Sequence, residues 1–288
     1  MGTEMPGPDL QPYFERIGFE GPAPATRDTL TRLHQAHVEA IPFENLTPLM
    51  GERVALEPEA LLAKLVSAGR GGYCYEHNLL FHDVLTALGF DVTLLSARVV
   101  WQQPEDAPPG PRTHTLLKVE LPEGTYLADV GFGGLTQTVP LRFALDAPQE
   151  TTHEPFRILE VAPGIYQIEA LVAGTWTRLY RFDLQPQTRI DYELGNHFVA
   201  THPSSFFTFW LLGARPFPGG RYAVFNNALT VHRLGAESEK TVFDNVADFR
   251  QALEEKLLIR LPAGEGLDAA LGRLLEGGVI EMSRPTRP

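Results

Sequence analysis

The chain has 288 residues, 43% of them apolar and 21% charged, with a formal net charge of −12. This length allows one large domain or two to three small ones, and the composition is that of a folded protein. The negative charge disfavours nucleic acid and anionic membranes as general partners, and no apolar run is long enough to span a membrane. One cysteine and an N-terminus unlike a signal peptide predict a reducing, cytoplasmic location.

The first ninety residues have the three- and four-residue apolar spacing of helices. Asp28 is expected to cap a helix that ends at Pro42. Pro58 opens a second helix that stops near Gly69, and a third runs over residues 74–88 before Gly89. The pattern predicts a helical bundle over residues 1–90.

The apolar period then changes from helical to alternating. Six strands are predicted, at residues 92–100, 113–121, 126–130, 156–161, 165–172 and 175–182. Short turns such as Ala162-Pro163-Gly164 favour antiparallel neighbours. We expect a central antiparallel β-barrel over residues 91–195, with residues 185–203 as a connecting segment.

The last third of the chain contains both helical and alternating spacings of apolar residues. Strands are predicted at 222–225, 229–234 and 241–243, and helices at 246–258 and 266–275. The aromatic residues of segment 206–210 are more typical of a core than of a ligand cage. Residues 196–288 therefore form an expected α/β domain, and the whole chain is assigned to the α+β class.

The single cysteine lies in the segment Arg70-Gly71-Gly72-Tyr73-Cys74. Glycines before a helix allow a sharp turn and close approach of other groups. A thiol in the first helical turn is expected to have a lowered pKa, and the free N–H groups there can hold an oxyanion. The alternative is a small buried side chain that only packs. The local sequence leaves both interpretations open.

A cysteine nucleophile needs a base, and the base needs an acceptor that orients it. His114 begins a predicted strand, and Asp129 ends the next one, so the two can lie side by side. The other histidines have no carboxylate or cysteine at metal-ligand spacing, so no metal site is predicted.

These segments together resemble the arylamine N-acetyltransferase family. The likeness rests on the motifs Arg70-Gly71-Gly72-Tyr73-Cys74-Tyr75-Glu76, Pro42-Phe43-Glu44-Asn45-Leu46, Thr113-His114, Asp129-Val130-Gly131-Phe132-Gly133 and His202-Pro203-Ser204-Ser205-Phe206. Their order and spacing match the family, and the matches run from about residue 13 to residue 260.

The resemblance implies a helical bundle, a β-barrel and an α/β lid, with a catalytic triad of Cys74, His114 and Asp129. It also implies a ping-pong reaction without a metal. Acetyl-CoA acetylates the cysteine, CoA leaves, and a small arylamine or arylhydrazine takes the acetyl group. Neither nucleic acid nor membrane is an expected partner.

The resemblance further assigns side chains to roles. Phe132, Phe43 and Tyr73 are expected to bind the acceptor; Trp101, Thr113, Gly131 and Gly133 are expected to contact CoA. Arg70 and Glu44 are expected to form a buried structural pair. The oxyanion is assigned to the Cys74 N–H and to backbone near Trp101 or Gln102.

Other functions fit the same residues. Relatives that act as amide synthases release or cyclise a polyketide acyl chain on an aryl amine with the same triad. A cysteine hydrolase would use water in place of the amine. A binding protein that kept the fold is disfavoured because all three triad residues are present.

Overall fold

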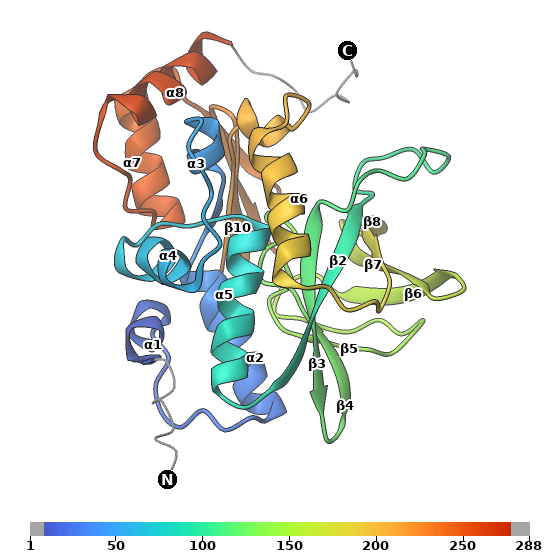
Figure 1. Cartoon of the computed structure of the whole chain (residues 1–288). Coiled ribbons are helices and arrows are strands. Elements are labelled where there is room, and N and C mark those ends of the chain that lie inside the picture. The colour runs from blue at the N-terminus through green and yellow to red at the C-terminus, as the bar shows by residue number, and fades with distance from the viewer. Residues whose placement is uncertain (1–8, 278–288) are drawn as a thin grey trace.

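The computed structural model describes residues 9–277 and has a helical part, a barrel and a second sheet backed by helices (Figure 1). The helices of the first part are α1 (Gln11–Ile17), α2 (Arg27–Ala40), α3 (Leu46–Leu49), α4 (Pro58–Leu61), a π-helix (Leu62–Ser67) and α5 (Cys74–Ala87). Sequence periodicity missed α1 and α3. It also predicted one helix where α4 continues into the π-helix.

The predicted N-cap of α2, Asp28, was wrong by two residues. Thr26 has the extended backbone of an N-cap, and its hydroxyl oxygen accepts the Thr29 N–H at 3.4 Å. Asp28 lies in the first helical turn, where its carboxylate interacts favourably with the helix dipole. Both residues are good N-caps, so sequence alone did not separate them.

Helix α5 lies at the centre of the molecule. Every residue from Cys74 to Phe81 is buried, although Glu76, His77 and Asn78 are polar. It contacts strands β3 (His114–Leu121) and β2 (Asp91–Val99) of the barrel, and also α4. A helical segment buried on all sides must hydrogen-bond its polar side chains internally, which explains the dense polar network around the N-terminus of α5.

The barrel is a seven-stranded antiparallel sheet with the order β5-β4-β3-β2-β8-β7-β6. Its strands are β2 (Asp91–Val99), β3 (His114–Leu121), β4 (Gly124–Ala128), β5 (Leu141–Arg142), β6 (Phe156–Ala162), β7 (Ile165–Val172) and β8 (Thr175–Phe182). Two isolated bridges, Leu145–Ile158 and Gln149–Phe156, bring the segment after β5 against β6, so the barrel is nearly closed. Leu95, Leu116 and Ile168 are fully buried inside it.

The second sheet has the order β1-β9-β10-β11-β12 and joins a segment of the N-terminal helical part to strands of the last third of the chain. Its strands are β1 (Phe43–Glu44), β9 (Leu212–Phe217), β10 (Gly220–Phe225), β11 (Ala228–Arg233) and β12 (Glu239–Val242). Helices α7 (Val246–Leu257) and α8 (Glu265–Glu276) share a hydrophobic core with its residues. Strands β1 and β9 were not predicted. The pairing of β1 with β9 ties the helical part to this sheet.

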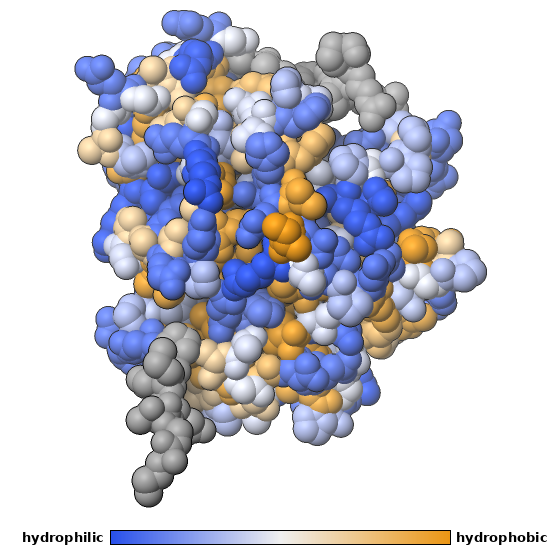
Figure 2. Space-filling model, viewed as in Figure 1, coloured by the Kyte–Doolittle hydropathy of each residue, from blue (hydrophilic) through white to orange (hydrophobic). Residues whose placement is uncertain are grey.

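The segment expected as a connection contains α6 (Arg189–Thr201), followed by a 3-10 turn (Phe206–Thr208). Phe206 and Phe209 are 39% and 46% exposed, so their assignment to the core was wrong, whereas Phe207 packs against the core as predicted. On the face shown in Figure 2, hydrophobic residues form small patches among hydrophilic ones. No helix in residues 9–277 is long and apolar enough to cross a membrane.

Candidate active site

Cys74 is the first residue of α5 and is only 4% exposed. The turn before it requires glycine, because a Cβ on Gly71 would lie 2.1 Å from the Pro42 carbonyl oxygen. A Cβ on Gly72 would lie 2.7 Å from Glu76 Oε2. That carboxylate accepts the Tyr73 N–H at 3.1 Å and fixes the start of the helix. The sequence thus places the thiol at a helix start where one glycine packs against a backbone carbonyl and the next against the Glu76 carboxylate.

His114 and Asp129 lie together at one end of neighbouring strands. His114 begins β3, and Asp129 follows the last residue of β4, which pairs with Leu117. His114 Nε2 donates to Asp129 Oδ2 at 2.7 Å, and the two side chains are 3% and 0% exposed. A carboxylate only accepts, so Nε2 carries the proton and Nδ1 is the nitrogen left to act as a base.

The Asp129 carboxylate is held in its charged form although burial opposes ionisation. Oδ1 accepts the Gly131 N–H at 3.0 Å and the Asn78 side-chain amide at 3.2 Å. Burial alone would raise the pKa of Asp129, but His114 and these two donors hold it below its usual value. A buried acceptor with a lowered pKa is suited to orient an imidazole and to stabilise its charged form.

Three residues that the sequence did not single out complete this cluster. His34 Nε2 accepts the Asp129 N–H at 3.3 Å, and Asn78 Oδ1 accepts the Val130 N–H at 3.1 Å. The Tyr180 ring lies 4.6 Å from that of His114, and burial and the Asp129 carboxylate raise the pKa of its hydroxyl. One signal was present for Tyr180: it lies two residues before the buried Phe182 in β8, so both side chains are on the same face of the strand.

Gly131 brings the Asp129 segment against the cysteine. A Cβ on Gly131 would lie 2.7 Å from Cys74 Cα and 3.2 Å from the Asn78 amide nitrogen. Thr115 also crosses between the elements, because its hydroxyl donates to the Cys74 carbonyl oxygen at 3.0 Å. The barrel and α5 are therefore in direct contact at the thiol.

The Cys74 thiol donates to the Thr113 carbonyl oxygen at 3.6 Å, next to His114 in the chain. Burial, followed by the nearby Asp129 carboxylate, raises the pKa of this thiol. Hydrogen bonds from Tyr75 and Thr115 lower it by less. The helix start lowers the pKa of Cys74 as expected, but burial and the Asp129 carboxylate outweigh it, so the expectation of a lowered pKa overall was wrong. Ionisation needs a neighbouring group that takes the proton.

Residues expected to bind the acceptor have different surroundings. The Phe132 ring lies 5.0 Å from the His114 ring, whereas Phe43 stacks on His77 at 6.5 Å. Tyr73 is fully buried, and its hydroxyl already donates to Asn196 of α6. This corrects the expectation for Tyr73: it packs the site and offers no free group to an acceptor.

One of the expected oxyanion donors, the Trp101 N–H, needs correction. The Trp101 N–H donates to the Leu179 carbonyl oxygen at 3.0 Å, so it is already used within the barrel. Gln102, the next residue, has a left-handed backbone with φ of 56°. The Cys74 N–H, the other expected donor, lies in the first turn of α5, where N–H groups have no partner within the helix.

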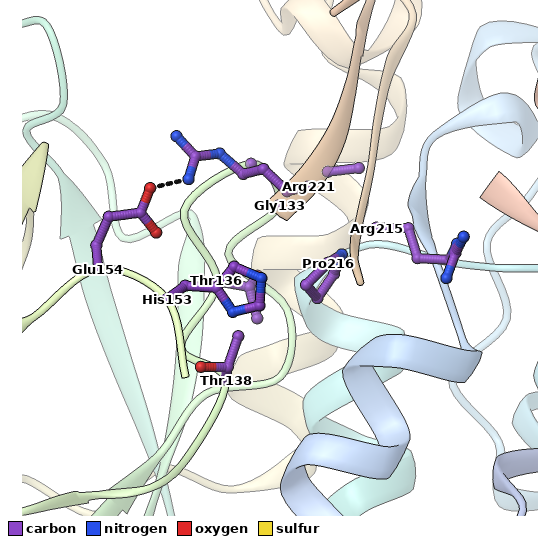
Figure 3. A pocket seen from close by; sticks show the side chains of 10 residues that line it. Gly133, Thr136, Thr138, His153, Glu154, Arg215, Pro216 and Arg221 are labelled. Atoms are coloured by element: carbon purple, nitrogen blue, oxygen red, sulfur yellow. Dashed lines mark hydrogen bonds and ion pairs between the residues drawn. The ribbon is translucent and has the colours of Figure 1, made fainter. Parts of the chain in front are cut away.

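A small pocket lies beside the Gly131–Gly134 loop, between the barrel and the second sheet (Figure 3). Its volume is about 240 Å³ when the space open to solvent is included. Gly133 and Thr138 line it, and the paired side chains of Glu154 and Arg221 border it. The expected CoA contacts at Trp101, Thr113 and Gly131 are not part of its lining.

Arg70 and Glu44 form a buried ion pair beneath the turn. Both Arg70 Nε and Nη2 donate to Glu44 Oε1, at 2.9 and 2.7 Å, and Glu44 Oε2 accepts the Leu46 N–H at 2.6 Å. Burial opposes the charge on Glu44, but Lys64 and Arg70 hold its pKa below its usual value. Within residues 9–277, no cluster of three or more histidine, cysteine or acidic side chains could hold a metal ion.

Comparisons with known proteins identify the family. A family model described as N-acetyltransferase matches residues 26–265. Arylamine N-acetyltransferase from Mycolicibacterium smegmatis is 44% identical, over 93% of this chain and 98% of its own length. The Escherichia coli enzyme of that name is 40% identical over 91% of each chain.

A solved structure gives the same result. Mycobacterium marinum arylamine N-acetyltransferase in complex with CoA superimposes with a TM-score of 0.88 at 40% identity, over 92% of this chain and 99% of that one. The sequence and structural matches agree over nearly the whole length, so the chain belongs to the arylamine N-acetyltransferase family.

Proposed function

We propose that this protein transfers an acetyl group from acetyl-CoA to arylamines or arylhydrazines through an acetylated Cys74. One observation carries the proposal: the buried hydrogen bond between His114 and Asp129 leaves His114 Nδ1 as a base beside the segment that contacts the thiol. Family membership supplies the reaction class, and the M. marinum complex shows that a relative binds CoA.

The first half-reaction acylates the enzyme. His114 Nδ1 takes the thiol proton, and the Cys74 sulfur attacks the thioester carbonyl carbon of acetyl-CoA. The first-turn N–H of Cys74 stabilises the developing oxyanion. The carbon–sulfur bond to CoA then breaks, and the His114 imidazolium returns its proton to the leaving thiolate. Asp129 stabilises the imidazolium during this step.

The second half-reaction transfers the acetyl group. An arylamine is largely unprotonated at neutral pH, so its nitrogen can attack the thioester carbon on Cys74. His114 accepts one proton from the nitrogen and gives it to the Cys74 sulfur as the carbon–sulfur bond breaks. The net products are an N-acetylarylamine and free CoA. Phe132 beside His114 offers an aromatic face to the acceptor ring.

The same geometry supports a placement of CoA. We place the acyl end of the donor between Cys74 and the Thr113–His114 segment, with Gly131 and Gly133 allowing close approach. Trp101, at the barrel end near this segment, is placed along the rest of the donor.

Intact-mass measurement tests the proposal. Acetyl-CoA alone should add the mass of one acetyl group to the wild-type protein and nothing to Cys74→Ala. Adding an arylamine should remove the adduct and release N-acetylarylamine. An adduct that persists in Cys74→Ala would contradict the assignment of the nucleophile.

The same experiment separates transfer from hydrolysis. The acetylated protein, freed of excess acetyl-CoA, is incubated with buffer alone or with an arylamine. Transfer predicts a long-lived adduct in buffer and rapid loss with the amine. Equal rates of loss in both would identify a hydrolase instead.

A further inference from the structure

A row of buried hydrogen-bonding side chains runs through the helical part and ends at the turn before Cys74. Tyr13 of α1, His37 of α2 and His77 of α5 are each 0% exposed. The Tyr13 hydroxyl and His37 Nδ1 are 2.8 Å apart, and His37 Nε2 and His77 Nδ1 are 2.9 Å apart. His77 Nε2 lies 3.1 Å from the carbonyl oxygen of Pro42. We call this row the Tyr13–His37–His77 relay.

The chemistry of the last acceptor fixes the direction of every bond. A carbonyl oxygen only accepts, so His77 Nε2 must carry a proton and donate to Pro42. In a neutral ring Nδ1 then accepts, which makes His37 Nε2 the next donor. His37 Nδ1 must therefore accept from the Tyr13 hydroxyl. One arrangement of protons satisfies the whole relay, and both imidazoles in it are neutral Nε2–H tautomers.

The surroundings keep both rings neutral. Burial lowers the pKa of His77 to about 4; Lys64 also lowers it, and the Pro42 hydrogen bond and Glu44 oppose this shift. Burial also lowers the pKa of His37, with smaller contributions from His77, His34 and Arg16. The proton order is therefore unchanged across the neutral pH range.

The relay ends where the nucleophile is positioned. The Pro42 carbonyl oxygen also accepts the Gly72 N–H at 3.3 Å, and it is the atom that a Cβ on Gly71 would strike. The Glu44 N–H donates to the Gly72 carbonyl oxygen at 2.7 Å. His77 lies one turn after Cys74 on α5 and stacks on Phe43. The hydrogen bond from His77 Nε2 to Pro42 thus joins α5 to the Pro42–Glu44 segment, which in turn holds the Gly71–Gly72 turn.

We propose that the Tyr13–His37–His77 relay positions Cys74 for acylation by locking the Gly71–Gly72 turn to the Pro42 carbonyl. His77 acts through this turn and touches no reacting atom, so it is a positioning residue. The inference rests on the proposed acetyl transfer to Cys74, and its tests keep the two separable.

The central test compares two replacements of His77 in the full chain. In His77→Gln the side-chain amide can still donate to Pro42, whereas in His77→Leu it cannot. The rate of Cys74 acetylation at saturating acetyl-CoA should fall about ten- to hundredfold in His77→Leu and be largely retained in His77→Gln. The acetyl-CoA concentration for half-maximal rate should change less than about twofold, because the donor does not touch His77.

A matched control is available on the same helix. His82 lies on α5 outside the relay and contacts Asp83, so His82→Leu should acetylate at the wild-type rate. Wild-type rates in a His77→Leu protein that is folded by circular dichroism would overturn the proposal. Equal losses in His77→Gln and His77→Leu would also overturn it.

Nuclear magnetic resonance of ¹⁵N-labelled wild-type protein tests the relay without any substitution. Both His37 and His77 should give the pattern of a neutral Nε2–H ring at pH 7. An Nδ1–H ring or an imidazolium at either position would contradict the proton order. If wild-type Cys74 does not acetylate, the proposed function fails; iodoacetamide alkylation of Cys74 in the two His77 variants then still tests the positioning.

Discussion

The imidazole of His114 and the carboxylate of Asp129 share a 2.7 Å hydrogen bond that is almost completely removed from solvent. The bond fixes which imidazole nitrogen is free, and it places a negative charge near a thiol whose pKa burial has already raised. Cys74 is therefore a poor nucleophile by itself and depends on His114 to accept its proton. The reactivity belongs to the three residues together.

Replacing Asp129 with asparagine should abolish most of the rate of Cys74 acetylation, although the new side chain has nearly the same shape. The amide cannot stabilise the imidazolium, and it can favour the other tautomer of His114. We expect a loss of at least about a hundredfold in the rate of Cys74 acetylation. Single-turnover mass measurement gives that rate. Asp28→Asn, at an exposed carboxylate, is the control and should be unchanged; a similar loss there would point to a general effect of charge.

Alkylation by iodoacetamide should show that His114 takes the proton. In the wild type, Cys74 should react at pH 6 faster than an ordinary thiol with a pKa near about 8.5. In His114→Asn no base accepts the thiol proton, and the pKa of the thiol is raised. Alkylation should therefore be slow from pH 6 to pH 8. A wild-type rate that keeps rising with pH, as for a free thiol, would mean that no ion pair forms.

Gly131→Ala should disturb the site by steric contact alone. The added Cβ would lie 2.7 Å from Cys74 Cα, so backbone must move in α5 or in the loop. We expect a loss of about 1–3 kcal/mol in the free energy of unfolding and a large fall in acetylation. Urea unfolding measures the free energy of unfolding, and the rate of Cys74 acetylation measures the loss of activity.

Gly134→Ala provides the matched control for this prediction. A Cβ at Gly134 would meet no heavy atom within 4 Å, although the residue lies only three positions along the same loop. Wild-type stability and activity are therefore expected. If the two variants behave alike, close packing of Gly131 against Cys74 does not explain the effect.

Local sequence predicted every barrel strand except β5, and most helices, because their apolar periods reflect which face is buried. It failed where tertiary contacts determine the element. Strand β1 has only two residues, Phe43 and Glu44, and exists because β9 pairs with it. The pKa of Cys74 was misjudged for the same reason: the helix start is local, but burial and the Asp129 charge come from the folded barrel.

The relay histidines were discounted in the sequence because they have no acidic or cysteine partner at metal spacing. That observation concerned metal ligands only, and it could not reveal a hydrogen-bonded row. Tyr13, His37 and His77 are separated by 24 and 40 residues. Their contact depends on how α1, α2 and α5 pack, which no local pattern encodes.

The buried histidines should make the protein sensitive to mild acid. Burial lowers the pKa of His34 and of His77 to about 4, and that of His37 is also lowered. In the unfolded chain these rings have a pKa near about 6.5. Between pH 6.5 and pH 4 the unfolded state therefore binds more protons, so stability falls as pH falls. Each ring should cost about 1–2 kcal/mol between pH 7 and pH 5.

Urea unfolding at pH 7, 6 and 5 measures this slope. His77→Gln removes one titrating ring and should flatten the slope, whatever its effect on stability at pH 7. His197→Gln, at an exposed position of α6, should leave it unchanged. Because Asp129 has a lowered pKa, its contribution is lost only at lower pH, below its unfolded value near about 3.9. Equal slopes in wild type and His77→Gln would show that His77 is not a buried neutral ring.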